Sequence, residues 1–136
     1  MFKLLSGASK TEYFPKTAST VISVGVLVAS VNGQLVPATA TTTSHIGISI
    51  KPVASTDDDY ASATFIPVLI PSQDTIFEAD ASGLTTALVN TTMDLSNSQY
   101  VNGAADSRHA VTLVKYISAT KGWFKINSLT AYKNGA

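Results

Sequence analysis

The 136-residue sequence contains no cysteine and few charged residues. Without cysteine there can be no disulfide framework and no thiolate metal site, which fits folding in the cytosol. Charged residues make up 13% of the chain and hydrophobic residues 45%, a combination that excludes an intrinsically disordered chain. Serine and threonine together number 33. This composition, in a chain of this length, indicates one β-rich domain whose outer faces carry hydroxyl groups.

Long hydrophobic runs are also lacking. Residues 1–10 carry one lysine and a short apolar group, too little for the apolar region of a secretory signal. Residues 17–50 carry no charge, but their densest apolar part, residues 21–31, is shorter than the ~20 residues of a membrane-spanning helix. That part is rich in β-branched residues and is followed directly by Asn32-Gly33. We therefore expect a strand here, a soluble protein and no membrane partner.

The formal net charge is zero. The chain therefore lacks the basic surplus with which nucleic-acid-binding proteins displace counterions from phosphates, and we expect no nucleic-acid partner. The charges are sorted along the chain, however: residues 1–51 carry +3, residues 52–106 carry −8 and residues 107–136 carry +5.

Two interpretations of this sorting stay open. Distant segments can neutralise one another within one fold, or an acidic face of one copy can meet a basic face of another. In the second case, the candidate inter-subunit contacts are the acidic loop residues Asp57, Asp58 and Asp59 and the basic residues Arg108 and Lys115.

Alternating apolar residues, interrupted by turn residues, predict short strands. Asn32-Gly33 is the strongest hairpin signal, because a type I′ turn needs positive φ at both central positions. Pro67 and Pro71 bracket one apolar run, which predicts a strand that lies at a sheet edge or is split in two. No long segment has a helical period. The predicted strands cover residues 21–28, 34–36, 45–53, 64–70, 75–80, 85–95, 109–118 and 123–129.

This spacing predicts an all-β fold, namely a small β-barrel or sandwich of about eight short, mostly antiparallel strands. We expect a single domain over residues 20–136. Residues 1–19 have no clear period, and Tyr13-Phe14-Pro15 is their only apolar cluster. We expect these residues to form an extended N-terminal arm that is disordered or held against a partner.

Candidate catalytic and metal-binding residues are few. His45 and His109 begin predicted strands without a third ligand at a supporting spacing, so surface positions are the better interpretation. Residues 106–109, Asp-Ser-Arg-His, contain the residue types of a nucleophilic triad. Adjacent residues point in different directions, however, and no G-x-S-x-G elbow is present. The three consecutive aspartates of residues 57–59 lack the spacing and central glycine of a calcium loop.

Two further patterns have a simpler structural interpretation. Glu78 and Asp80 would share one face of a strand, as a glycosidase pair does, but surface strands often carry such pairs. A platform for stacking sugars or bases could include Trp123, Tyr116, Phe124 and Tyr132. Without a basic groove or paired acids, we favour core and edge packing for these aromatic residues. We expect no enzymatic activity, no catalytic residue, no metal and no cofactor.

Several short motifs, taken in order, resemble the small β-rich head decoration (cement) proteins of tailed bacteriophages. The first is Val-Gly-Val-Leu-Val at residues 24–28, followed by Asn-Gly-Gln-Leu-Val-Pro-Ala at residues 32–38. The second is His-Ile-Gly-Ile-Ser at residues 45–49. The third is the proline-bracketed run at residues 66–71, which leads into Phe-Glu-Ala-Asp at residues 77–80. Later matches in the same order are Met-Asp-Leu at residues 93–95 and Gly-Trp-Phe-Lys-Ile at residues 122–126.

The resemblance covers roughly residues 20–129, and it implies a β-barrel-like fold, symmetric oligomers that are often trimers, and no catalysis. It implies a virion protein on the capsid exterior, assembled in the host cytoplasm. Such a protein cements neighbouring major capsid protein subunits and stabilises the head against internal pressure. The family offers no invariant site residues to transfer, and the arm has no match in it. We expect the arm to contact the capsid through Lys10, Tyr13, Phe14 and Lys16.

Three other functions stay open. The chain could be a carbohydrate- or receptor-binding β-module of a virion fibre, which clustered exposed aromatic residues would favour. It could be a head–tail connector or tail-tube subunit, which would form rings. It could be a small hydrolase, which would require a carboxylate beside His109.

Overall fold

A computed structural model describes residues 1–42 and 45–127. These residues form strands and one 3-10 turn, and no α-helix occurs among them, which confirms the all-β prediction. In this part of the chain there is accordingly no helix with the length and apolarity needed to cross a bilayer. The strands are β1 (Lys3–Ser6), β2 (Ser9–Pro15), β3 (Leu27–Val31), β4 (Gln34–Pro37), β5 (Gly47–Ser49), β6 (Phe65–Pro71), β7 (Ile76–Ser82), β8 (Thr92–Leu95), β9 (Tyr100–Asn102), β10 (Val111–Ser118) and β11 (Lys121–Ile126); the turn is η1 (Thr86–Leu88).

Five strands of the first sheet close into a small barrel. The sheet has the order β1-β7-β11-β10-β8-β9, and a parallel pairing between β7 and β9 closes the ring. β1 pairs antiparallel with the first half of β7 and places Lys3 opposite Glu78. The inside of the barrel is filled by buried apolar side chains, among them Phe77, Met93, Leu113 and Phe124. The predicted small barrel is therefore present.

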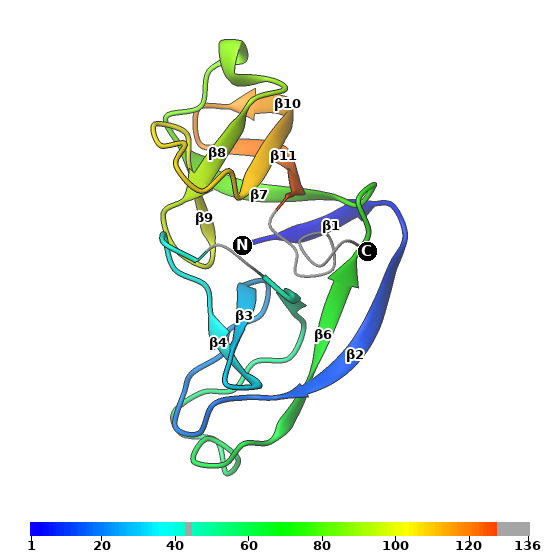
Figure 1. Ribbon diagram of the computed structural model, residues 1–136, viewed down its shortest axis with the longest axis vertical. Helices are drawn as coiled ribbons and strands as arrows, with labels where there is room; N and C mark the ends of the chain where they lie inside the picture. The colour runs from blue at the N-terminus through cyan, green and yellow to red at the C-terminus, as the bar shows by residue number, and fades with distance from the viewer. Residues whose placement is uncertain (43–44, 128–136) are drawn as a thin grey trace.

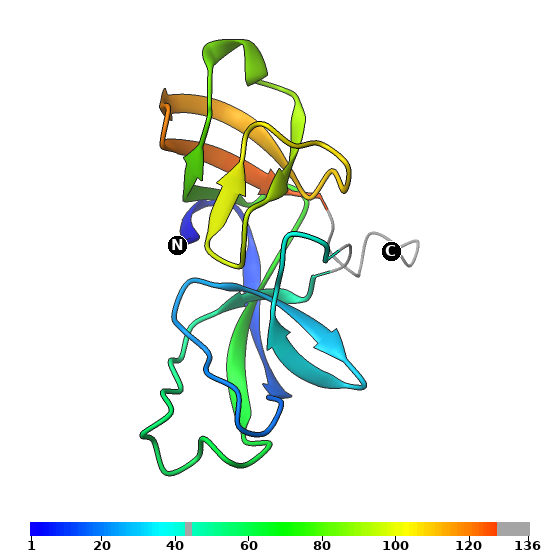
Figure 2. The ribbon, with the colours of Figure 1, turned by 90° about the vertical axis from the view of Figure 1, so that its left-hand side faces the viewer.

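The second sheet is antiparallel and surrounds a separate core. Its order is β2-β6-β5-β3-β4, and an isolated bridge between Lys16 and Leu35 brings the end of β2 to β4. Ile22, Ile66 and Val68 are among the buried residues of this second core. In Figures 1 and 2 the barrel forms the upper part of the molecule and the second sheet the lower part.

Local sequence signals explain two of these elements. Asn32 and Gly33 have φ of 52° and 80°, as a type I′ turn requires, and they connect β3 to β4. Gly47 begins β5, which pairs with β6, and a Cβ atom at this position would overlap the carbonyl oxygen of Leu69 in β6. A residue with a side chain would therefore push these two strands apart.

Residues 1–19 differ from the expected arm, because they pair within the chain. β1 pairs with the barrel strand β7, and β2 pairs with β6 through seven consecutive partners from Ser9–Pro71 to Pro15–Phe65. Phe2 is 2% exposed and its ring packs edge-on against Phe77. The segment shows no period in the sequence because β1 and most of β2 leave the side chains of both faces exposed.

Three further details differ from the sequence predictions. β6 is neither an edge strand nor split, because it lies between β2 and β5; its ladder with β5 stops at Val68, next to Pro67. The first long strand begins at Leu27 rather than at residue 21, after Gly25 with φ of 75°. β9 lies between the predicted strands 85–95 and 109–118, where no strand was predicted. The last two residues of the predicted strand 123–129 lie outside the described residues.

Candidate functional site

An exposed aromatic surface lies on the outer side of β2 and β6. In this antiparallel pair Tyr13 is opposite Pro67, and Pro15 is opposite Phe65, so the four residues share a face. Ile50 extends the same row, because its backbone N–H donates to the carbonyl oxygen of Pro67 at 3.4 Å. Tyr13 is 65% exposed and Phe65 is 62% exposed. We call these five residues the aromatic face.

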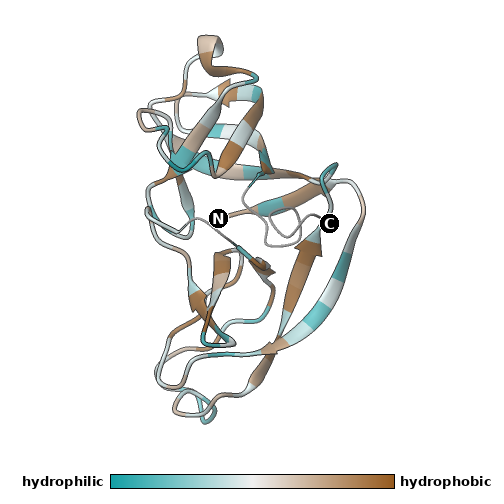
Figure 3. Cartoon of the chain, in the orientation of Figure 1, coloured by the Kyte–Doolittle hydropathy of each residue, from teal (hydrophilic) through white to brown (hydrophobic). Residues whose placement is uncertain are grey.

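The backbone beneath the aromatic face is held by the second core. On the opposite side of the same two strands, Ile66 and Val68 are fully buried and Phe14 packs partly buried against them. Figure 3 shows β6 as mostly hydrophobic, whereas β2 alternates with hydrophilic residues. Leu69, farther along the outer side of β6, packs against the barrel core, whereas Phe65 stays exposed. The exposed apolar surface on this side is therefore confined to the part of the strand pair around Tyr13 and Phe65.

The four residues expected to contact a capsid are placed differently from one another. Lys10 is exposed and forms an ion pair with Glu12 at 3.0 Å, and Tyr13 lies on the aromatic face. Phe14 points toward the second core. Lys16 is 0% exposed, and its Nζ donates to the carbonyl oxygens of Thr17 and Tyr60 at 3.1 and 2.7 Å.

Lys16 therefore ties β2 to the loop that contains Tyr60, and its ammonium group lies within the fold rather than on a contact surface. Sequence reasoning missed Phe65. The alternation along β6 could have identified it. Side chains of a strand point alternately to its two sides, so Phe65, Pro67 and Leu69 lie on the side opposite to the buried Ile66 and Val68.

The candidate inter-subunit residues lie in different parts of the fold. The loop with Asp57, Asp58 and Asp59 is at the lower end in Figure 1, whereas Lys115 is on β10 in the barrel. Asp57 accepts the N–H of Ala54 at 2.8 Å. Asp59 pairs with Lys51 at 3.6 Å, and Asp58 is exposed.

Arg108 is exposed in the loop before β10, and its Nε donates to the carbonyl oxygen of Thr41 at 3.4 Å. Within one chain the acidic loop and these basic residues therefore do not meet.

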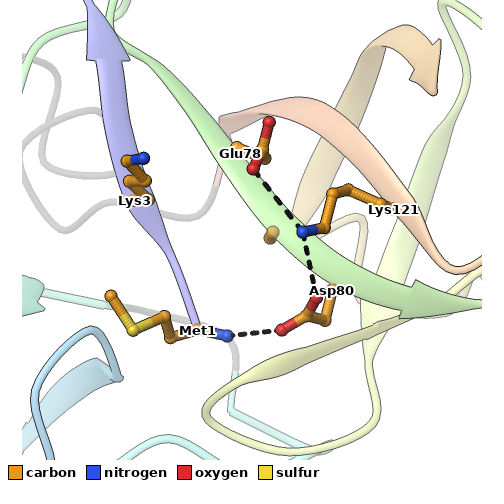
Figure 4. A pocket seen from close by; sticks show the side chains of 6 residues that line it. Met1, Lys3, Glu78, Asp80 and Lys121 are labelled. Carbon is orange, nitrogen blue, oxygen red and sulfur yellow. Dashed lines mark hydrogen bonds and ion pairs between the residues drawn. The ribbon is translucent and has the colours of Figure 1, made fainter.

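A pocket of about 220 Å³ lies on the outer side of the barrel, between β1, β7 and the start of β11 (Figure 4). Its lining residues are Met1, Lys3, Glu78, Ala79, Asp80 and Lys121. The Nζ atom of Lys121 is 3.7 Å from Glu78 Oε1 and 3.9 Å from Asp80 Oδ1. The terminal ammonium group of Met1 donates to Asp80 Oδ2 at 2.8 Å.

These contacts favour the ionised form of Asp80. The hydrogen bond from the Met1 ammonium group holds the pKa of Asp80 below its ordinary value, with further help from Lys121 and against the effect of burial. A glycosidase needs one carboxyl group that stays protonated to act as general acid. The pocket favours the opposite state for Asp80, so Asp80 is unsuited to the role of general acid.

A second polar cluster surrounds His109. Its Nδ1 is 2.7 Å from Asp106 Oδ1 and 3.0 Å from the hydroxyl of Thr92, which also donates to Asp106 at 2.8 Å. A catalytic relay uses one imidazole nitrogen for the acid and the other for the nucleophile. Here both groups meet the same nitrogen, so the carboxylate beside His109 does not complete a triad.

Asp94 anchors the loop that carries this cluster. Its buried carboxylate accepts the backbone N–H groups of Ser107, Arg108 and His109 at 2.9, 2.6 and 3.1 Å. Burial raises the pKa of Asp94, but these three hydrogen bonds and the charge of Arg108 outweigh it and bring the pKa below its ordinary value. The cluster is thus held by a backbone-binding carboxylate.

The other residues singled out from the sequence occupy different environments. His45 is fully buried, which corrects the expected surface position. Phe124 is buried in the barrel core and Tyr116 packs partly buried against it, whereas Trp123 lies on the outer side. Tyr132 is outside the described residues. Within residues 1–42 and 45–127, no group of three or more His, Asp or Glu side chains is arranged to hold a metal ion.

The sequence matches no protein-family model, and it matches no curated protein.

Proposed function

We propose that this protein is a virion structural protein that binds the outside of a bacteriophage capsid through its aromatic face and cements neighbouring major capsid protein subunits. The observation that carries the proposal is the exposure of Tyr13 and Phe65 on one side of the β2–β6 pair, while Ile66 and Val68 on the other side of β6 are buried in the second core. The order of motifs that resembles head decoration proteins supports the choice of partner, and so does the all-β fold.

The aromatic face can supply a useful binding energy. Covering the exposed parts of Tyr13 and Phe65 would remove about 250 Å² of mostly apolar surface from water, which contributes about 6 kcal/mol before the cost of association. Aromatic anchors of this kind often dominate an interface. On a capsid, many copies of the partner surface lie close together, so a modest affinity at each contact is sufficient for stable attachment.

Self-association is part of the proposal. No ion pair joins Asp57, Asp58 or Asp59 to Arg108 or Lys115 within the described residues. A contact between the acidic loop of one subunit and the basic residues of the next is a head-to-tail contact. Such contacts close into a ring when the rotation between neighbouring subunits divides a full turn evenly. A trimer on the capsid is the expected product.

The test is binding of the purified protein to capsids that lack decoration. We expect saturable binding and a higher disruption temperature of the capsids. The double substitution Tyr13→Ala and Phe65→Ala should weaken binding by more than about tenfold. Tyr100→Ala is the matched control, because Tyr100 is 44% exposed but lies on β9 of the barrel. No binding, or equal loss in the control, would refute the proposal.

A further inference from the structure

The outer side of the barrel carries a row of charged residues around the single tryptophan of the chain. Across four neighbouring strands, Lys3 is opposite Glu78, Glu78 is opposite Trp123, and Trp123 is opposite Lys115. Along β11, Lys121 and Lys125 flank Trp123 on the same side, while the alternate residues are buried. We call this set the Trp123 face: Lys3, Glu78, Asp80, Lys115, Lys121, Trp123 and Lys125.

Trp123 is oriented by polar contacts on this face. Its Nε1 donates to Glu78 Oε2 at 3.2 Å, and Lys115 Nζ lies 4.6 Å from the ring centroid. The indole is therefore fixed at its edge, and the ammonium group of the exposed Lys115 lies over its ring. A ligand ring can replace that ammonium group without disturbing the core, because Lys115 is exposed and forms no ion pair in the described part of the chain.

The charges of the Trp123 face do not cancel. Lys121 forms ion pairs with both Glu78 and Asp80. Lys3, Lys115 and Lys125 have no carboxylate within 4.0 Å among residues 1–42 and 45–127. Three cations on a face with two already paired carboxylates favour an anionic ligand.

The carboxylates point to a ligand that also carries hydroxyl groups. Lys121 is 3.7 and 3.9 Å from Glu78 and Asp80, which is longer than a hydrogen bond. A hydroxyl oxygen placed between these groups can accept from Lys121 and donate to a carboxylate, as a bridging water does. The pocket of about 220 Å³ beside them has room for a small polar substituent.

We propose that the Trp123 face binds an acidic saccharide. One sugar ring lies on the indole of Trp123 in place of the Lys115 ammonium group, and the sugar's carboxylate pairs with Lys115 and Lys125. The hydroxyl groups meet Glu78, Asp80 and Lys121. A single-stranded DNA fits less well, because its chain carries no free hydroxyl groups between the phosphates that could donate to Glu78 and Asp80. This site is independent of the aromatic face, which lies on the second sheet.

The test uses the fluorescence of Trp123, which reports on this face alone because the chain has one tryptophan. The probes are oligogalacturonate, a neutral cello-oligosaccharide of equal length and single-stranded oligo-dT. We expect a saturable change with oligogalacturonate that weakens as salt is raised. We expect little change with the neutral oligomer and weaker binding of oligo-dT.

Substitutions distinguish specific binding at the Trp123 face from nonspecific electrostatic attraction of an anionic ligand. Lys115→Gln with Lys125→Gln should weaken oligogalacturonate binding by about tenfold or more, and Glu78→Ala should weaken it through the lost hydroxyl contact. Lys10→Gln with Lys51→Gln removes the same charge elsewhere and should leave binding unchanged. Calorimetry of Trp123→Phe should show weaker binding.

Equal binding of the neutral oligomer, tighter binding of oligo-dT, equal loss in the control pair or no response to any probe would each overturn the assignment. Tyr13→Ala with Phe65→Ala should leave saccharide binding intact, so this proposal and capsid attachment fail separately.

Discussion

Replacing Asp94 should destabilise the fold in a strongly pH-dependent way. The Asp94 carboxylate is 6% exposed and accepts three backbone N–H groups from the loop before β10. Asp94→Asn keeps the shape but removes the charge and turns an NH₂ group toward these donors. Asp94→Ala removes the acceptor altogether and leaves the donors without their partner.

The expected loss follows from those three hydrogen bonds. A hydrogen bond to a charged group contributes about 1.5–3 kcal/mol, and bonds to one carboxylate are not additive. We therefore expect Asp94→Ala to lower the free energy of unfolding by about 3–5 kcal/mol at neutral pH and Asp94→Asn to lower it by about 2–3 kcal/mol.

The pH dependence has a definite sign. In the unfolded chain the Asp94 carboxyl has a pKa of about 3.9, and in the folded protein its pKa is lower. The unfolded state therefore takes up a proton first as the pH falls. The contribution of Asp94 is complete above the unfolded value and is lost as the pH falls through about 3.9 toward the lower folded value.

Urea denaturation of the wild type and both variants between neutral and acidic pH measures this effect. The difference in unfolding free energy between wild type and Asp94→Asn should be largest at neutral pH and should shrink below about pH 4. A difference that stays constant into strong acid would refute the reasoning, because it would mean that the charge of Asp94 does not contribute.

Three further substitutions probe the backbone and the second core, each followed by urea denaturation. Gly33→Ala should cost about 1 kcal/mol, since φ is 80° but nothing lies within 4 Å of a new Cβ atom. Gly47→Ala should cost more, about 2–3 kcal/mol, because its Cβ atom would overlap the Leu69 carbonyl of β6; equal effects of the two glycine variants would contradict this. Lys16→Met should cost about 2–4 kcal/mol, because it leaves the Tyr60 carbonyl without its buried donor; an unchanged midpoint would show that this hydrogen bond is dispensable.

Elements with strong local signals were predictable from the sequence. The Asn32-Gly33 turn, the following strand β4 and the alternating strands β7, β10 and β11 lie close to their predicted positions. In each of them the residues that enter the core alternate with residues that do not, and the turn residues match the backbone that they adopt.

Elements that depend on a distant partner were not predictable in the same way. β1 and β2 have mostly exposed side chains, so only their ladders with β7 and β6 define them as strands. β9 has three residues and exists through pairing with β7 and β8. β6 tolerates Pro67 in a central position because the neighbouring ladder ends beside it.

The sequence alone determined that this protein is an all-β domain without disulfides, because alternation and turn residues act over a few positions along the chain. Only the tertiary structure decided which polar residues are buried and which aromatic residues are exposed. Lys16 is enclosed because a loop more than forty residues away supplies the carbonyl of Tyr60. Phe65 and Trp123 face outward because each strand can turn only one of its two sides toward the core. Pairing with the partner strands determines which side that is.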